Sequence, residues 1–182
     1  TTFRVNEWLD EVDKKRYEEL YITNPRRARI VCDGEWGVAE GLVFENFQVK
    51  DFDALEKIKE IQETTFGMDY GFTHDPTTLV NSVVDLNNKE IWIYDEHYEK
   101  GMTTQDIYDM LAEKELLKAS ITGDSAEPRL IKELQSKGVR RLHASVKGKG
   151  SIMHGINFLQ GFKIYIHPKC VHTIEEFNTY TF

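Results

Sequence analysis

The sequence has few cysteines, few prolines and no long apolar run, and each shortage excludes a class of protein. Its two cysteines, Cys32 and Cys170, form no CxxC pair and cannot build a disulfide framework, so we expect a reduced, cytosolic setting. No apolar run approaches the roughly 18 residues that span a bilayer. The first residues have neither the basic nor the apolar region of a signal peptide. The pattern GxxxxGK followed by Ser or Thr is missing, so no P-loop nucleotide triphosphatase is encoded.

What the chain does have is enough apolar sequence for one globular domain: 40% of its 182 residues are hydrophobic and 12% are aromatic. The formal net charge of −8 argues against a nucleic-acid ligand, because neutralising phosphates needs a basic surface. The charge is unevenly distributed, however. Between Leu134 and Ile174 there are seven Lys or Arg and no Asp or Glu, which leaves −15 for the rest of the chain. The chain does not begin with Met, which suggests a piece of a longer polypeptide.

Hydrophobic periodicity predicts three strands, at 64–70, 78–86 and 90–98, that form an antiparallel meander. The later elements are expected as a helix at 103–114, a strand at 118–122, a helix from Pro128 to just before Gly138, a strand at 140–144, a helix at 151–159, a strand at 163–166 and a helix at 171–180. This order predicts an α/β fold with a mixed sheet of about five main strands flanked by helices, as in ribonuclease H.

The first part of the chain is expected to form a separate, smaller unit. Residues 1–59 are interpreted as an N-terminal α/β linker region that packs on a main body at 60–182. Within it, the pattern predicts a helix at 6–20 and strands at 28–32 and 38–44.

Two acids at the ends of predicted strands are the candidate catalytic residues. Asp69 ends the first strand between Gly67 and Gly71, and such glycines let another backbone or a ligand approach closely. Asp124 follows the fourth strand. If the first and fourth strands are parallel neighbours, both carboxylates reach the same edge of the sheet, where they would suit Mg²⁺ or Mn²⁺.

The alternative for each acid is purely structural, because Asp124 could cap the next helix and Asp69 could simply end its strand. Asp95 and Glu96 are interpreted as solvated positions of a hairpin.

Residues 146–151 (VKGKGS) are a glycine-rich basic loop that leads into a helix. Backbone N–H groups at a helix N-terminus, with lysines beside them, favour phosphate contact. The alternative is an ordinary solvated loop. The residues expected to bind DNA are Lys147, Lys149, Arg140 and Arg141.

Several segments, in this order, resemble motifs of the nuclease domain of large terminase subunits from tailed bacteriophages. Residues 67–77 (GMDYGFTHDPT) look like its first nuclease motif, 123–128 (GDSAEP) like its second and 147–152 (KGKGSI) like its downstream basic loop. Residues 40–44 (EGLVF) are similar to the segment that joins the motor ATPase to the nuclease. The similarity is closest to headful-packaging siphophages that infect Gram-positive hosts.

The resemblance implies a ribonuclease H-like endonuclease that cuts concatemeric double-stranded viral DNA when packaging starts and ends. It implies that Asp69 and Asp124 bind Mg²⁺ or Mn²⁺ in a two-metal site, together with a third acid that either lies beyond Phe182 or is absent. It also implies an ATPase domain before Thr1, with the terminase small subunit and the portal protein as partners. The expected location is the host cytoplasm, with no membrane association and no place in the mature virion. The isolated domain is expected to be a monomer.

The resulting hypothesis is two-metal phosphodiester hydrolysis, in which Asp69 bridges two ions about 3.5–4 Å apart and Asp124 holds one of them. Two alternatives stay open. One is a non-cutting module that guides DNA or docks on the packaging motor. The other is a junction resolvase on the same fold.

Overall fold

The computed structural model describes residues 14–15, 17–18 and 42–181. The chain divides into two compact units, one spanning Gln48–Ile174 and the other comprising Thr1–Phe47 with Glu175–Phe182. The predicted strand at 28–32 lies outside the described residues. Four residues of the predicted helix at 6–20 are described, and all four are helical. The boundary between residues 59 and 60 stays a prediction.

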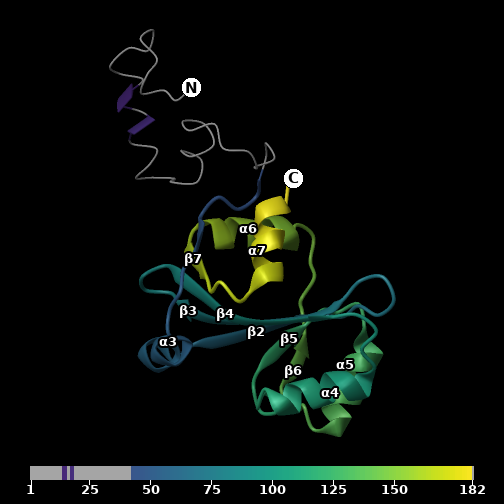
Figure 1. Ribbon diagram of the computed structural model, residues 1–182. Coiled ribbons are helices and arrows are strands. Elements are labelled where there is room, and N and C mark those ends of the chain that lie inside the picture. The colour runs from purple at the N-terminus through teal and green to yellow at the C-terminus, as the bar shows by residue number, and fades with distance from the viewer. Residues whose placement is uncertain (1–13, 16, 19–41, 182) are drawn as a thin grey trace. The chain divides into compact units, whose positions relative to one another are not determined.

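Seven strands form one mixed sheet in the order β1-β7-β4-β3-β2-β5-β6 (Figure 1). They are β1 (Phe47–Val49), β2 (Thr64–Asp69), β3 (Thr77–Asp85), β4 (Glu90–Glu99), β5 (Ile121–Gly123), β6 (Leu142–Ala144) and β7 (Lys163–Ile166). The strands β2, β3 and β4 form the predicted antiparallel meander. On one side β5 pairs parallel with β2 and β6 pairs parallel with β5, while on the other side β7 pairs parallel with β4. The predicted α/β fold with a mixed sheet is confirmed.

The described helices are α3 (Ala54–Ile61), α4 (Thr104–Glu113), α5 (Pro128–Lys137), α6 (Ser151–Gln160) and α7 (Val171–Thr179). Figure 1 shows α4 and α5 beside each other on one side of the sheet and α6 on the other side. Among the residues that the structure describes, no helix is long and apolar enough to cross a membrane.

Local signals fix the ends of two of these helices as the sequence predicts. The Thr103 hydroxyl accepts a hydrogen bond from the Asp106 N–H at 3.2 Å, and the Asp106 carboxylate accepts one from the Thr103 N–H at 2.8 Å. This reciprocal capping box starts α4. Pro128 occupies the first turn of α5, and Gly138 ends that helix with a φ of 126°.

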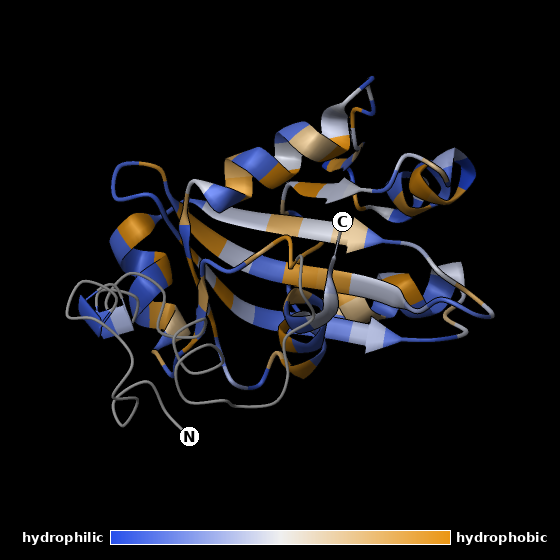
Figure 2. Cartoon of the chain, turned by 90° about the horizontal axis from the view of Figure 1, so that it is seen from above, coloured by the Kyte–Doolittle hydropathy of each residue, from blue (hydrophilic) through white to orange (hydrophobic). Residues whose placement is uncertain are grey.

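The main hydrophobic core lies between the sheet and the layer formed by α4 and α5. Its fully buried members include Leu79, Leu111, Ile121, Leu134 and Leu142, which come from β3, α4, β5, α5 and β6. Hydrophobic and hydrophilic bands follow one another along the central strands (Figure 2), as expected where one face of a strand packs on the core. This packing fixes the positions of the strand ends that carry the candidate acids.

Three elements differ from the sequence predictions. The helix α3 is missing from the predictions; none of its residues is buried, and the Asp53 carboxylate caps its N-terminus by accepting hydrogen bonds from two backbone N–H groups. The strand β5 begins at Ile121 rather than at 118, because the backbone turns at 115–119 and the Ala119 N–H donates to the Leu116 carbonyl. The strand predicted at 38–44 is not present over 42–44, the part of it that is described.

Candidate metal and DNA site

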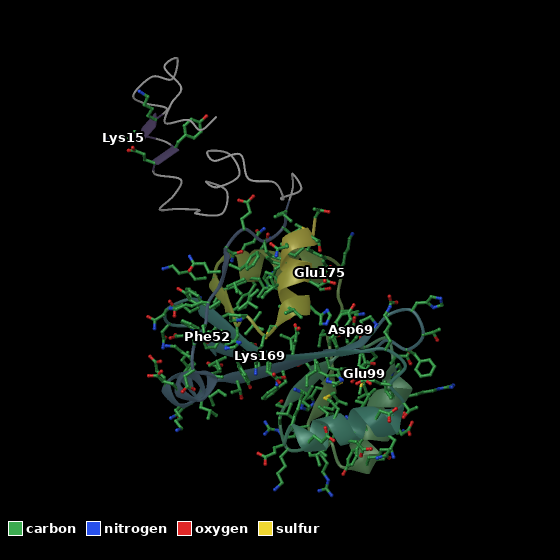
Figure 3. The ribbon with its side chains drawn as sticks, in the orientation of Figure 1. Lys15, Phe52, Asp69, Glu99, Lys169 and Glu175 are labelled. Carbon is green, nitrogen blue, oxygen red and sulfur yellow. The ribbon has the colours of Figure 1, made fainter. Side chains whose placement is uncertain are left out.

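The two candidate acids follow paired positions on neighbouring parallel strands. In the register of β2 and β5, Met68 pairs with Gly123, and the Asp124 N–H donates to the Met68 carbonyl at 2.9 Å. Asp69 and Asp124 are therefore next to each other across strands that lie about 5 Å apart. The condition set by the sequence, that the first and fourth predicted strands be parallel neighbours, is confirmed. Figure 3 labels Asp69 at this end of the sheet, near Glu99 at the end of β4.

Asp124 is held by a lysine and by its own turn. Lys147 Nζ forms an ion pair with Asp124 Oδ1, and the side chains of the two residues are 59% and 25% exposed. The hydrogen bond from Lys147 is the main cause that lowers the pKa of Asp124, and backbone hydrogen bonds from Ala126 and Ser125 lower it further. Asp124 is therefore a charged carboxylate at neutral pH. Asp69 is exposed, and its Oδ1 accepts a hydrogen bond from the Tyr70 N–H at 2.9 Å.

The basic loop starts beside these acids because β6 lies next to β5. The Ser145 N–H donates to the Gly123 carbonyl at 2.8 Å, and the Ser145 hydroxyl accepts from the Ser125 N–H at 3.2 Å. Lys147 and Lys149 follow in the same exposed segment. The structure thus brings the first of the expected DNA-binding lysines into contact with a candidate metal ligand.

Arg140 and Arg141 lie elsewhere. Both are exposed and precede β6, and the Arg141 carbonyl accepts from the Ile121 N–H at the start of β5. Because β5 and β6 run parallel, the arginines stand at the opposite ends of these strands from Asp124 and Lys147. The separation is one strand length, about 10 Å.

A partly buried tyrosine, Tyr70, lies against the turn that carries Asp124. A Cβ added to Gly123 would stand 2.3 Å from the Tyr70 hydroxyl oxygen, so this position accommodates only glycine without a shift. Within the described residues the Tyr70 hydroxyl is buried without a hydrogen-bond partner. Burial raises the pKa of this phenol, and the charges of Asp124 and Asp69 raise it further. A buried hydroxyl without a hydrogen-bond partner, next to two carboxylates, is a feature of sites that bind an ion, a water molecule or a ligand.

The glycines that flank Asp69 differ from each other. A Cβ on Gly71 would stand 2.2 Å from the Asp75 carbonyl oxygen, so the close backbone approach predicted at this glycine is confirmed. A Cβ on Gly67 would meet nothing within 4 Å.

The donor set fits a hard divalent cation. Two adjacent carboxylates supply oxygen ligands, and Mg²⁺ is typically bound by one or two carboxylates, with waters and substrate phosphates completing its shell. Within the described part of the chain, no group of three or more His, Cys, Asp or Glu side chains could hold a metal ion. Asp69 and Asp124 form a pair of adjacent oxygen donors rather than such a group.

Two acids of β4 have structural roles that the sequence analysis missed. The interpretation of Asp95 as a solvated hairpin position is wrong, because its carboxylate binds Lys114 Nζ at 2.6 Å and Lys169 Nζ at 3.0 Å. Burial raises the pKa of Asp95, but the hydrogen bonds from both lysines outweigh this and the net pKa is lowered. The interpretation of Glu96 is wrong as well, since its carboxylate accepts the Thr173 N–H and hydroxyl at 2.8 and 2.7 Å and so caps α7. The partners lie far along the chain, where no local pattern reveals them.

The fold and the position of the acids define a class of protein. Residues 69–182 match the family model described as the terminase RNase H-like domain, and residues 1–35 match that of the phage terminase large subunit. The chain belongs to the terminase RNase H-like domain family.

Relatives of known identity agree with this assignment. The chain is 31% identical over 190 residues to the PBSX phage terminase large subunit of Bacillus subtilis (strain 168), covering all of this chain and 43% of that protein. It is 26% identical over 162 residues to the large terminase subunit of Bacillus phage SPP1, covering 87% of this chain and 38% of that protein. The chain therefore spans less than half the length of these curated relatives.

Solved structures show the same fold. The nuclease domain of the SPP1 large terminase, crystallised with bound Mn, superposes with a TM-score of 0.67 at 27% identity, covering 74% of this chain and 78% of that one. The large terminase of a thermophilic bacteriophage, in complex with ATP-gamma-S, superposes with a TM-score of 0.58 at 21% identity, covering 99% of this chain and 47% of that one. The ribonuclease H-like terminase fold is thus confirmed.

Proposed function

We propose that this chain is the metal-dependent endonuclease domain of a viral DNA-packaging terminase, which cuts concatemeric double-stranded DNA when packaging starts and ends. The observation that carries the proposal is the adjacency of Asp69 and Asp124 at the ends of two parallel strands, with a lysine-containing loop beside them. Membership of the terminase family and the nuclease domain of SPP1 with bound Mn support it.

Asp69 and Asp124 would hold the Mg²⁺ or Mn²⁺ ions. Such ions would supply a water nucleophile at neutral pH and stabilise the departing 3′ oxygen, and cleavage of that bond would leave 5′-phosphate and 3′-hydroxyl ends. The chain's own contribution is to keep Asp124 ionised and the two carboxylates adjacent. The lowered pKa of Asp124 and the fixed register of β2 and β5 serve this purpose.

The lysines of the loop would contact the DNA backbone. Lys147 pairs with Asp124 and Lys149 follows it in the same exposed segment, so we assign to both the phosphates nearest the cut. Arg140 and Arg141 would contact phosphates about one strand length away. Phosphate contacts position the duplex and carry no sequence information, so little sequence preference is expected from these four residues.

In the complete protein, the proposed partners are double-stranded DNA, the terminase small subunit and the portal protein. The proposed place of action is the host cytoplasm, and the isolated domain is proposed to be a monomer.

Nicking of supercoiled plasmid in the presence of Mn²⁺ tests the proposal. Asp69→Ala and Asp124→Ala should each abolish nicking while the circular dichroism spectrum stays that of the wild type. Asp109→Ala is the matched control, because Asp109 is an exposed aspartate on α4. Nicking that persists in either site variant would remove the assignment.

A further inference from the structure

The ion pair between Lys147 and Asp124 joins two functions that the proposed mechanism keeps separate. Asp124 is a candidate metal ligand, and Lys147 belongs to the loop expected to bind phosphate. A carboxylate oxygen that accepts a lysine ammonium offers that oxygen less readily to a metal ion, because both cations need the same lone pairs. In this structure the lysine therefore occupies part of the coordination capacity of Asp124.

The loop around Lys147 is anchored at one end and open in its middle. Ser145 is tied to the end of β5 by two hydrogen bonds, and the Ser151 N–H closes a turn onto the Gly148 carbonyl at 3.0 Å. Between these points Val146 is 94% exposed. A Cβ on Gly148 would meet nothing within 4 Å. Lys147 can therefore leave Asp124 by rotating its own side chain, without disturbing packed neighbours.

Building on the proposed function, we propose that Lys147 and the divalent cation compete for Asp124, and that the displaced Lys147 becomes a DNA phosphate ligand. An ion with two charges replaces the ammonium at the carboxylate, and the freed ammonium then takes the nearest other anion. In DNA-bound protein that anion is a backbone phosphate beside the site.

This exchange makes metal binding and DNA binding mutually supportive. Metal at Asp124 releases Lys147 for DNA, and DNA that holds Lys147 exposes Asp124 to metal. By linkage, each ligand must raise the affinity for the other by the same factor. Without DNA, Lys147 lowers the affinity of the site for metal, so the site fills with metal mainly in DNA-bound protein.

The first experiment measures Mn²⁺ affinity by electron paramagnetic resonance titration of the 182-residue chain without DNA. Lys147→Ala should bind Mn²⁺ about two- to fivefold more tightly than the wild type, as expected for the loss of one exposed ion-pair competitor. Lys147→Arg keeps the charge and should keep the wild-type affinity. Lys149→Ala is the matched control, because it removes the same charge from the same loop. Among the described residues, Asp124 forms its ion pair with Lys147, so Lys149→Ala should leave the Mn²⁺ affinity unchanged.

The second experiment measures the coupling by fluorescence anisotropy of a short labelled duplex, with Ca²⁺ as the cation so that the DNA stays intact. The factor by which the cation tightens DNA binding should fall about two- to fivefold in Lys147→Ala and stay at the wild-type value in Lys149→Ala. If the cation tightened DNA binding only by bridging the protein and a DNA phosphate, this factor would stay unchanged in both Lys147→Ala and Lys149→Ala.

The outcomes separate this proposal from the proposed function. Equal Mn²⁺ affinity in the wild type and Lys147→Ala, or an equal gain in Lys149→Ala, overturns the competition and leaves the nuclease assignment standing. If Asp124→Asn does not weaken Mn²⁺ binding at all, Asp124 is not a metal ligand and both proposals fall.

Discussion

Replacing Gly123 by Ala should strain the candidate site at one identifiable contact. The added Cβ would stand 2.3 Å from the Tyr70 hydroxyl oxygen, 2.9 Å from Cζ and 3.1 Å from Cε2. Tyr70 packs against the main hydrophobic cluster, so its ring cannot move aside without disturbing that packing. The substitution should therefore displace the ring or the turn that carries Asp124.

The magnitude follows from the cost of overpacking. Inserting one methyl group into a packed region costs about 1–3 kcal/mol. For a chain of this size, each kcal/mol lowers the melting temperature by roughly 2–4 °C. Gly67→Ala is the matched control, since its Cβ meets nothing within 4 Å and the same Gly-to-Ala change should be tolerated there.

Tyr70→Phe provides the decisive comparison. It removes the atom at 2.3 Å and leaves Cζ at 2.9 Å, so Gly123→Ala should cost less in the Phe background than in the wild type. Removing a buried hydroxyl that has no partner among the described residues should itself be neutral or stabilising. Thermal unfolding of the four proteins gives a coupling energy, which we expect at about 0.5–3 kcal/mol. A penalty that is the same in both backgrounds, or no larger than that of Gly67→Ala, would refute the reasoning.

Three further predictions concern the stability of the fold, the burial of Cys170 and the ionisation of Asp124. Glu96→Gln removes a charged cap that accepts two hydrogen bonds from Thr173, so it should lower the free energy of unfolding in urea by about 1.5–3 kcal/mol. Glu99→Gln, at an exposed position, is the control and should have little effect. Burial raises the pKa of the Cys170 thiol to about 12. In a Cys32→Ser variant, iodoacetamide at about pH 8 should therefore react slowly with Cys170 in the native protein and quickly after unfolding. Equal rates would contradict the burial of this thiol. Because the pKa of Asp124 is lowered in the folded state, its stabilising contribution is present above pH 3.8, the usual pKa, and is lost as the pH falls through the lower folded value. Asp124→Asn should therefore reduce the fall of the melting temperature at acidic pH. An unchanged fall would contradict this reasoning.

The order of elements from β2 to α7 could be predicted because its signals are local. Buried and half-buried side chains alternate along β3, and Thr103, Pro128 and Gly138 mark the ends of α4 and α5. The helix α3 carries comparable signals, with Asp53 as its N-cap and Leu55, Ile58 and Ile61 at helical spacing, and the sequence analysis missed them.

The candidate site was partly predictable for a different reason. Asp69 and Asp124 stand out because acids at strand ends beside glycines are unusual, and parallel pairing is a topological expectation that the structure confirms. The contact of Lys147 with Asp124 could not be predicted, because it depends on β6 lying next to β5 and on the conformation of an exposed loop. The same limit applies to Glu96, whose partner Thr173 lies 77 residues further along the chain.

The acid-free window between Leu134 and Ile174 illustrates why a stretch of charge along the chain is not a charged surface. Of its cations, Lys169 pairs with Asp95 on β4, and Lys137 donates to Gln105 on α4 at 2.8 Å. Only Lys147 and Lys149, among the four expected DNA ligands, follow the strand ends where the acids lie. The slope of DNA affinity against salt concentration counts the phosphates that the protein neutralises. The double variant Lys147→Ala with Lys149→Ala should reduce this slope and also weaken the coupling to metal. The double variant Arg140→Ala with Arg141→Ala should reduce the slope and leave the coupling to metal unchanged. A coupling that depends equally on both pairs would mean that the window acts as one surface after all.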